Sequence, residues 1–567
     1  MSVPCPLCRA PRARLGSRPI PAIVLGLLIS GCGGSPAPAD RLTIAVEADP
    51  ASLDPRFGTD QASARVYQLV YNGLVRIDRN LRVSPDLAEA WEAPDPRTLV
   101  LRLRAGVRFH DGRPLSSADV RYTLESILDP ATGSPRRADF EAIERVETPD
   151  ARTVVLRLSR PFAPLLANLN VGLVGIIPAD PSLNHRRQPV GTGPFRFVSR
   201  RRDEDVWLEA NGDYWQGAPA FRQLRLKVVP TETGRALEML KGSVDAVVND
   251  LPPALVERFV DDPRFVVLTS PSNRYAYLGF NLEDPLAGRL PVRQALAQAV
   301  DIQALIRHHL YGRARPATGL LAPLLWGYHD PGPIYPHDPQ AAARRLEQAG
   351  FPDPDGEGPK PRFTLQYKCS TSETSLALAT ILQEQLRAVG IDLDIRSYEW
   401  ATFYDDIVHG RFQVFSLRWT NFLDPDVMRL RLHSQMAPPR GFNRGRYRNA
   451  ELDRLLDDGV AETHTAHRAA LYARAQELVA RELPYLSLWH EDNVAVLSSR
   501  VRGFELMPTA DFRAFGSVRL EPRGPQRASL PARAGTPAGS ALQEKTAAAA
   551  TGAPEPRRRA PAAAGRW

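Results

Sequence analysis

The segment "SLALATILQEQLRAVGIDLDIRSY", residues 375–398, decides the fold class because it joins a helix to a strand through one glycine. The part that ends at Gly390 has the pattern of a helix, and the part after it has the pattern of a strand. Alternation of this kind is typical of α/β domains.

Other segments continue the alternation of strands and helices. Strands with period-two apolarity are predicted at 42–48 ("LTIAVEA"), 97–103 ("RTLVLRL") and 152–158 ("RTVVLRL"), the last two resembling half-buried antiparallel strands. Helices are predicted at 291–306 with Pro291 in the first turn, at 338–350 between an Asp cap and a Gly stop, after Asn449, and at 466–482. A mixed α/β chain of this length exceeds one sheet, so we expect two lobes.

The N-terminal segment "IPAIVLGLLISGCGG", residues 20–34, indicates export and anchoring. Its apolar run is too short for a bilayer-spanning helix, which needs about twenty residues, and it follows a short region that holds arginines and no acids. Ile29-Ser30-Gly31-Cys32 resembles the lipobox of bacterial lipoproteins, which implies a signal peptide over 1–31, lipidation at Cys32 and a linker over 32–40. The alternative is an ordinary secretory signal with a chance cysteine.

Most of the net charge of +8 lies at the two ends. Residues 1–39 contribute +4 and residues 523–567 contribute +6, so the remaining residues carry −2. No basic face is left for nucleic acid, which we exclude as a partner. The Ala/Pro/Arg-rich residues 523–567 are predicted to be a disordered tail.

No motif in the chain indicates catalysis, a metal or a cofactor. "GTGPF" (191–195) lacks the lysine of a phosphate-binding loop, and no G-x-S-x-G or H-E-x-x-H is present. His464 and His467 have a spacing that could chelate a metal, but no third ligand is in view. We expect no enzyme and no cofactor. Cys369 is the one unmodified cysteine outside the predicted signal peptide, so we expect no intrachain disulfide.

Ten segments in order resemble the extracytoplasmic solute-binding proteins of peptide-type ABC importers, the family 5 group for dipeptides, oligopeptides and nickel. They cover roughly 42–510. The resembling segments are 51–78, 85–92, 103–125, 190–197, 211–219, 240–247, 278–285, 292–301, 399–419 and 483–490.

This resemblance implies a two-lobed periplasmic-binding-protein fold of type II, cluster C-like, with an extra subdomain in lobe I. Lobe I would comprise 41–272 and 491–522, with the subdomain at about 75–190, and lobe II would comprise 273–490. "YAYLGFN" and "PYLSLWH" would be the crossover strands. The ligand would be enclosed by hinge closure, and the closed protein would present it to a membrane permease.

The family pattern fails at one ligand contact. In peptide-binding members an Asp, three residues after the tryptophan that matches Trp419, holds the peptide's amino group. This chain has Phe422 there, and Asp424 or Asp426 would have to substitute. The alternative is that Asp424 only forms a turn with Pro425. The other predicted ligand contacts are Thr59, Asp60, Trp400, Trp419, Asn421, Trp489 and His490.

These observations predict a monomeric, lipid-anchored periplasmic receptor for a small peptide or peptide-like ligand, which delivers that ligand to an ABC permease and its ATPase. A non-peptide ligand, such as a nickel chelate, an opine or an oligosaccharide, is the alternative within the same class. An envelope chaperone or interaction protein is the alternative from another class.

Overall fold

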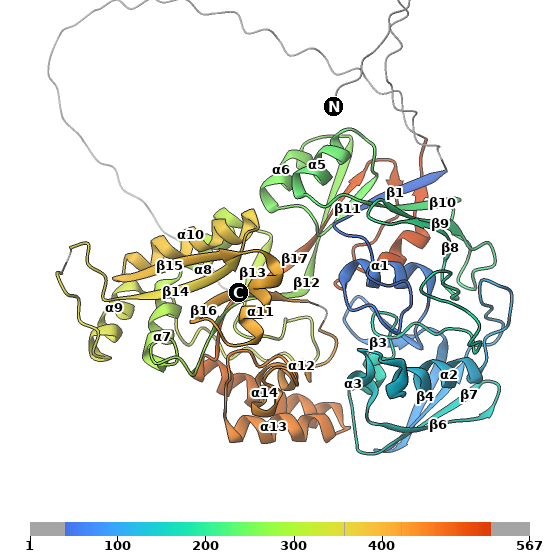
Figure 1. The fold of residues 1–567 in the computed structure, drawn as a ribbon, viewed down its shortest axis with the longest axis horizontal. Coiled ribbons are helices and arrows are strands. Elements are labelled where there is room, and N and C mark those ends of the chain that lie inside the picture. Colours follow the sequence, from blue (N-terminus) through green and yellow to red (C-terminus); the bar gives the residue numbers. More distant parts are fainter. Residues whose placement is uncertain (1–39, 357, 421, 523–567) are drawn as a thin grey trace, which may run out of the picture. The chain divides into compact units, whose positions relative to one another are not determined.

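Two long antiparallel strands, β12 (Phe265–Phe280) and β17 (Tyr485–Ser498), lie at the centre of the main sheet (Figure 1). The computed structural model describes residues 40–356, 358–420 and 422–522. The predicted signal peptide, Cys32, the linker up to residue 39, Asn421 and the tail from 523 lie outside the described residues. Among the described helices, none combines the length and apolarity needed to cross a bilayer.

The main sheet has eleven strands within the described residues and mixes parallel with antiparallel pairs. The pattern at 42–48 corresponds to β1, and the predicted crossover segments belong to β12 and β17, which pair with each other. The order is β15 (Ile391–Tyr398), β14 (Phe363–Ser370), β16 (Val414–Trp419), β12, β17, β11 (Ala246–Val248), β1 (Arg41–Val46), β10 (Gln223–Val228), β9 (Asp205–Ala210) and β8 (Phe195–Arg201), and β13 (Ala314–Pro316) pairs with β17.

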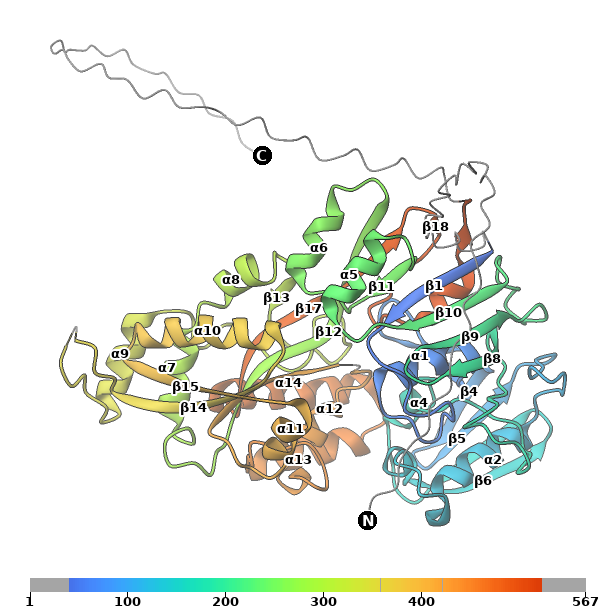
Figure 2. The ribbon, with the colours of Figure 1, turned by 45° about the horizontal axis from the view of Figure 1, so that its top comes forward.

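Each half of this sheet is covered on both faces. On β1, Leu42, Ile44 and Val46 enter one hydrophobic cluster with helix α1 (Gln61–Val70), whereas Ala45 faces a second cluster with α5 (Glu232–Leu240) and α6 (Pro253–Val260). Figure 2 shows α5 and α6 together beside β11. Side chains alternate along a strand, so this strand serves two cores at once.

The second half repeats the arrangement around β12. Ala276, Leu278 and Phe280 face the cluster formed with α7 (Leu290–Ala299), α9 (Pro339–Gln348) and α10 (Glu373–Arg387). Tyr275 and Tyr277 face the opposite cluster, formed with α11 (Trp400–Val408), α12 (Val427–Leu432), α13 (Ala450–Ala461) and α14 (Thr465–Glu482). The tyrosine face therefore belongs to the helices that surround Trp419.

A separate antiparallel sheet holds the two similar strands found in the sequence. They are β5 (Thr98–Leu103) and β7 (Thr153–Leu158), and they pair directly. The outer strands are β4 (Ala88–Asp95) and β6 (Ile143–Asp150), and α2 (Ser117–Leu128) covers the sheet. This is the extra sheet that the family resemblance implied.

The predicted helices form, with one exception in length. Asn449 caps α13, Asp338 caps α9, and α14 begins at Thr465. The helix expected over 291–306 instead ends at Ala299, because the chain turns at Val300 before a π-helical turn at Leu305–His309. Shorter elements are α3 (Arg137–Phe140), α4 (Leu165–Asn168), α8 (Ile302–Ala304), β2 (Val75–Ile77), β3 (Val83–Pro85), β18 (Val501–Arg502), β19 (Arg519–Leu520) and 3₁₀ turns at Pro130–Thr132, Ser434–Met436 and Phe512–Ser517.

Gly279 on β12 tests how tightly this sheet is packed. A Cβ at Gly279 would lie 2.3 Å from Cζ of the fully buried Phe415 ring, so Gly279→Ala forces that ring to move. We expect a loss of about 1–3 kcal/mol in the free energy of unfolding, measured by urea denaturation. Gly212→Ala is the matched control, because a Cβ there meets nothing within 4 Å. Equal stability of the two variants would contradict the packing described here.

Candidate ligand-binding site

The crossover strands carry a buried carboxylate held by two arginines. Glu491 on β17 accepts from Arg418 Nη1 at 3.1 Å and pairs with Arg274 Nη2 at 3.0 Å. Burial alone would raise the pKa of Glu491, but the charges of Arg418 and Arg274 outweigh it and hold the pKa at about 2. Glu491 is therefore ionised at every physiological pH and ties β12, β16 and β17 together.

The ladder between β12 and β17 is interrupted beside this carboxylate. The register shifts between Ser270 and Arg274, and the bulged residues turn their side chains to other partners. Ser272 Oγ donates to the Glu491 carbonyl at 2.5 Å, and Asn273 Nδ2 donates to the Phe422 carbonyl. The loop after Trp419 is thus fastened directly to the crossover.

Trp419, at the end of β16, is the centre of a cluster of aromatic rings. Its ring stacks on Tyr277 with centroids 5.9 Å apart and meets Phe442 edge-on at 5.5 Å. The indole is 8% exposed and Tyr277 is fully buried, whereas Phe442 is 39% exposed. The cluster therefore extends from the core of this half of the sheet to the surface.

Two buried guanidiniums lie against these rings. The Cζ of Arg431 is 4.2 Å from the Trp419 ring centroid, and that of Arg444 is 4.1 Å from it. Arg444 donates to the hydroxyls of Tyr277 at 3.2 Å and Tyr404 at 3.0 Å. Burial, with the charge of Arg444 beside it, lowers the pKa of Arg431 to about 9, so Arg431 is still cationic at neutral pH. Burial opposes the charge of Arg444 too, but the hydroxyls of Tyr277 and Tyr404 outweigh it and raise the pKa of Arg444.

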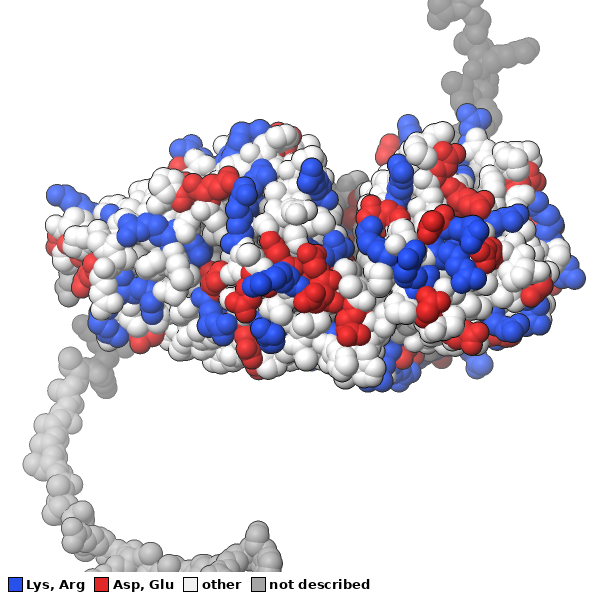
Figure 3. Space-filling model, turned by 90° about the horizontal axis from the view of Figure 1, so that it is seen from below, with Lys and Arg blue, Asp and Glu red and all other residues white. Residues whose placement is uncertain are grey.

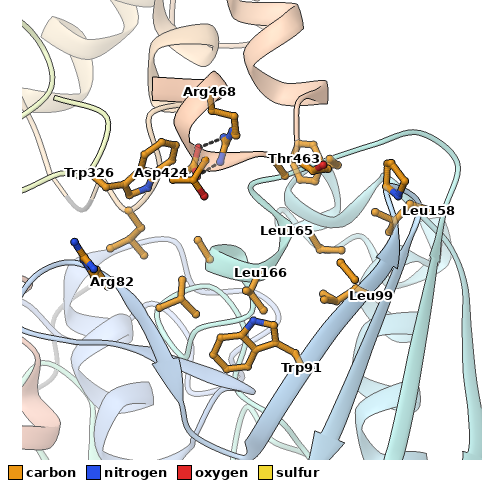
Figure 4. A pocket seen from close by; sticks show the side chains of 18 of the residues that line it. Arg82, Trp91, Leu99, Leu158, Leu165, Leu166, Trp326, Asp424, Thr463 and Arg468 are labelled. Carbon is orange, nitrogen blue, oxygen red and sulfur yellow. Dashed lines mark hydrogen bonds and ion pairs between the residues drawn. The ribbon is translucent and has the colours of Figure 1, made fainter. Parts of the chain in front are cut away.

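A cavity of about 490 Å³ opens beside the same loop, which lines it with Leu423 and Asp424 (Figure 4). Its apolar wall comes from the four-stranded sheet and the segment after it, including Trp91, Leu99 and Leu166. Its opposite wall comes from Trp326, Asp424 and Arg468. The two sides meet where the Ala163 amide donates to the Val460 carbonyl at 3.1 Å. This volume is in the usual range for small-ligand sites.

Asp424 already has a partner in this cavity. Both carboxylate oxygens accept from Arg468, at 2.7 and 3.0 Å, and one oxygen also accepts the Asp426 amide at 2.9 Å. Asp426 in turn pairs with Arg429 at 2.7 Å. A ligand ammonium at either carboxylate would have to compete with a bidentate arginine.

The structure brings only some of the predicted residues together. Trp400, 54% exposed on α11, stacks on Tyr404 at 5.7 Å and so joins the Trp419 cluster through Arg444. Asp424 lies on the other side of the same loop, facing the cavity.

The remaining predicted residues lie elsewhere. Trp489 is buried on the opposite face of the sheet. His490 is buried beside Tyr275, and burial lowers its pKa to about 4. Asp60 caps α1 by accepting the Ser63 amide at 2.8 Å, and Thr59 is exposed next to it.

Sequence reasoning missed Arg431 and Arg444. Both lie in an arginine-rich stretch that follows Trp419, and their spacing fits no binding motif. Their position relative to Trp419 depends on how α12 and the loop after Met436 fold back over β16, which no local pattern indicates.

Comparison with known proteins assigns the family. Residues 82–435 match the model of the bacterial extracellular solute-binding proteins, family 5. The chain belongs to this family. A putative ABC transporter peptide-binding protein of Brucella ovis is 31% identical over 449 residues, which are 76% of this chain and 83% of that protein. Heme-binding protein A of Haemophilus influenzae is 29% identical over 492 residues, 80% of this chain and 87% of that protein.

A solved structure agrees with the fold. The periplasmic binding protein DppA of Helicobacter pylori, in complex with the peptide STSA, is 27% identical and superimposes with a TM-score of 0.73 over 85% of this chain and 98% of that one. The periplasmic-binding-protein fold expected from the sequence is confirmed. Family 5 members are binding proteins, so the expectation of a non-enzymatic protein is also confirmed.

The surface charge of the described residues is mixed. Figure 3 shows Lys and Arg side chains interspersed with Asp and Glu side chains on the face that it presents. The net charge of −2 over 40–522 agrees with this distribution.

Glu491→Gln tests the carboxylate at the crossover. Removing one partner of a buried ion pair leaves the other charge uncompensated, so we expect a loss of about 3 kcal/mol in the free energy of unfolding at pH 7. Because the folded pKa of about 2 lies below the reference value of 4.5, this stabilisation is complete above pH 4.5 and declines as the pH falls toward 2. Urea denaturation of both proteins at pH 7, 5 and 3 measures the difference.

The control is Glu521→Gln, which removes an exposed pair with Arg502 and should have no measurable effect. A difference between wild type and Glu491→Gln that is as large at pH 3 as at pH 7 would rule out the ionic origin.

Proposed function

We propose that this protein captures a small peptide or peptide-like ligand outside the cytoplasm and delivers it to an ABC permease and its ATPase. The observation that carries the proposal is the loop after Trp419. The loop lies next to the aromatic rings and guanidiniums around Trp419, and its Asp424 lines a ligand-sized cavity. Its Phe422 carbonyl accepts from Asn273 on β12. Family membership and the peptide-binding relatives support the same class.

The predicted lobes follow from this proposal. Lobe I would comprise 41–272 with 491–522, and lobe II would comprise 273–490, with closure about the interrupted β12–β17 ladder. A ligand that contacts both lobes favours the closed state by its differential affinity. The residues proposed to contact it are Trp419, Trp400, Asp424 and Asn421 from lobe II and Thr59 and Asp60 from lobe I.

A non-peptide ligand is the second candidate. The observation that favours it is the bidentate Asp424–Arg468 pair, which occupies the carboxylate expected to hold a peptide amine. A relative named for heme binding shows that the family is not restricted to peptides. Nickel chelates, opines and oligosaccharides are therefore candidate ligands in addition to peptides.

Native mass spectrometry of the full chain, purified without refolding, tests the proposal first. We expect bound ligand mass that disappears on unfolding, because closure buries the ligand. A ladder of short-peptide masses would identify peptides, and one discrete other mass would identify the second candidate. A mass equal to the chain alone, with no binding to any peptide or metabolite mixture, would contradict solute capture.

The lipid anchor is a separate proposal. Cys32→Ser should move the protein from the membrane fraction to the soluble fraction, because acyl chains contribute about 0.8 kcal/mol per buried methylene and more than one chain is needed for stable anchoring. Fractionation of cells expressing each form measures this. The control is Cys369→Ser, which alters a fully buried thiol in the core and should leave the protein in the membrane fraction. Equal membrane retention of both variants would contradict the anchor.

A further inference from the structure

We propose that Arg431 and Arg444 form a binding site for an anionic group of the ligand, a carboxylate or a phosphate, next to Trp419. This inference rests on the proposed function, because it names the chemistry by which the same site recognises its ligand. It stands on the burial, the contacts and the charge balance of these two side chains.

The charge balance around Trp419 is not neutral. Four arginines and two aspartates lie on and near α12. Arg468 forms an ion pair with Asp424, and Arg429 forms one with Asp426. Among the described residues, no carboxylate lies within 4.0 Å of the guanidinium of Arg431 or Arg444.

Both unpaired cations are more than nine-tenths buried. Arg431 is 8% exposed and Arg444 is 4% exposed. Moving a charge from water into a protein interior costs several kcal/mol unless a counter-charge compensates it. Aromatic faces supply part of this compensation, but they leave two positive charges beside one indole.

Hydrogen-bonding capacity is also unused. Arg431 Nη1 donates to the Val427 carbonyl at 3.2 Å, while its buried Nε has no partner among the described residues. A guanidinium has five N–H donors in a planar fork that matches carboxylate and phosphate oxygens. An anion placed between the two arginines would satisfy these donors and remove their mutual repulsion.

Two aromatic rings that reach the surface lie next to this position. Phe442 contacts both guanidiniums, with centroid distances of 5.5 Å to Arg431 and 5.7 Å to Arg444, and its ring is 39% exposed. Trp400 is more exposed still and stacks on Tyr404, which accepts from Arg444. A ligand can therefore rest its apolar part on these rings and direct its anionic group inward.

Capped peptides test the contributions of the amino and carboxyl ends of a peptide ligand separately. N-acetyl-Ala-Phe carries a carboxylate and no ammonium, Ala-Phe-amide carries an ammonium and no carboxylate, and N-acetyl-Ala-Phe-amide carries neither. We expect the full chain to bind the first at least tenfold more tightly than the others in isothermal titration calorimetry. Inorganic phosphate should raise the melting temperature if the site takes phosphate, and sodium acetate should do so if it takes carboxylates.

Arg431→Met and Arg444→Met should each weaken binding of N-acetyl-Ala-Phe at least tenfold. Arg431→Met should also keep or raise the melting temperature of the ligand-free protein, because it removes a buried charge that has no carboxylate partner among the described residues. Arg446→Met is the matched control. Its side chain donates to the Val408 carbonyl outside the cluster, and it should bind like the wild type.

Three outcomes would overturn the proposal. One is tighter binding of Ala-Phe-amide than of N-acetyl-Ala-Phe, which would leave solute capture intact. Another is unchanged affinity for N-acetyl-Ala-Phe in both methionine variants. The third is failure of every anionic probe to bind or stabilise a protein that co-purifies with an uncharged ligand. Failure of the proposed function itself would show separately, as the absence of any co-purified or added ligand in native mass spectrometry.

Discussion

The pairing of β12 with β17 is the constraint on which the rest of the structure depends. The two strands contribute side chains to hydrophobic clusters in both halves of the main sheet, so neither half can form its core without them. The interruption of their ladder lies next to Glu491, where two arginines compensate one carboxylate. The break in the ladder and the ion pairs that join the strands therefore occur within a few residues of each other.

The charged side chains around Trp419 are paired differently from those at the crossover strands. At Glu491 the cations outnumber the carboxylate, yet every group has a partner of opposite sign. Around Trp419, Asp424 and Asp426 pair with arginines outside the ring cluster. Within the part of the chain that the structure describes, Arg431 and Arg444 contact aromatic faces and neutral acceptors and no carboxylate. Arginine thus stabilises the fold at Glu491, whereas the two arginines beside Trp419 would be stabilised by an additional negative charge.

Local sequence patterns predicted the elements well and the site incompletely. Strand patterns and helix caps are set by residues that are neighbours in the chain, so the sequence predicts them. Examples are the cap at Asn449 and the two similar strands, β5 and β7. The break after Ala299 was not predicted, because the apolar pattern continues through it. In the structure Val300 is extended and Asp301 caps the next short helix, α8. Trp489 and Trp419 are both predicted ligand contacts, but the two lie on opposite faces of the sheet. Arg431 and Arg444 gain their significance from what is absent around them, which only three-dimensional proximity reveals.

The hydrogen bond from Asn273 to the Phe422 carbonyl has an evolutionary consequence. It joins the loop after Trp419 to the bulge between the crossover strands, although the two segments lie far apart in the chain. A residue inserted in or deleted from that loop would displace Phe422 and break the bond, unless the bulge changed as well. Homologues in which the length of this loop has changed should therefore also differ in the bulge. The lengths of the two segments should covary in evolution.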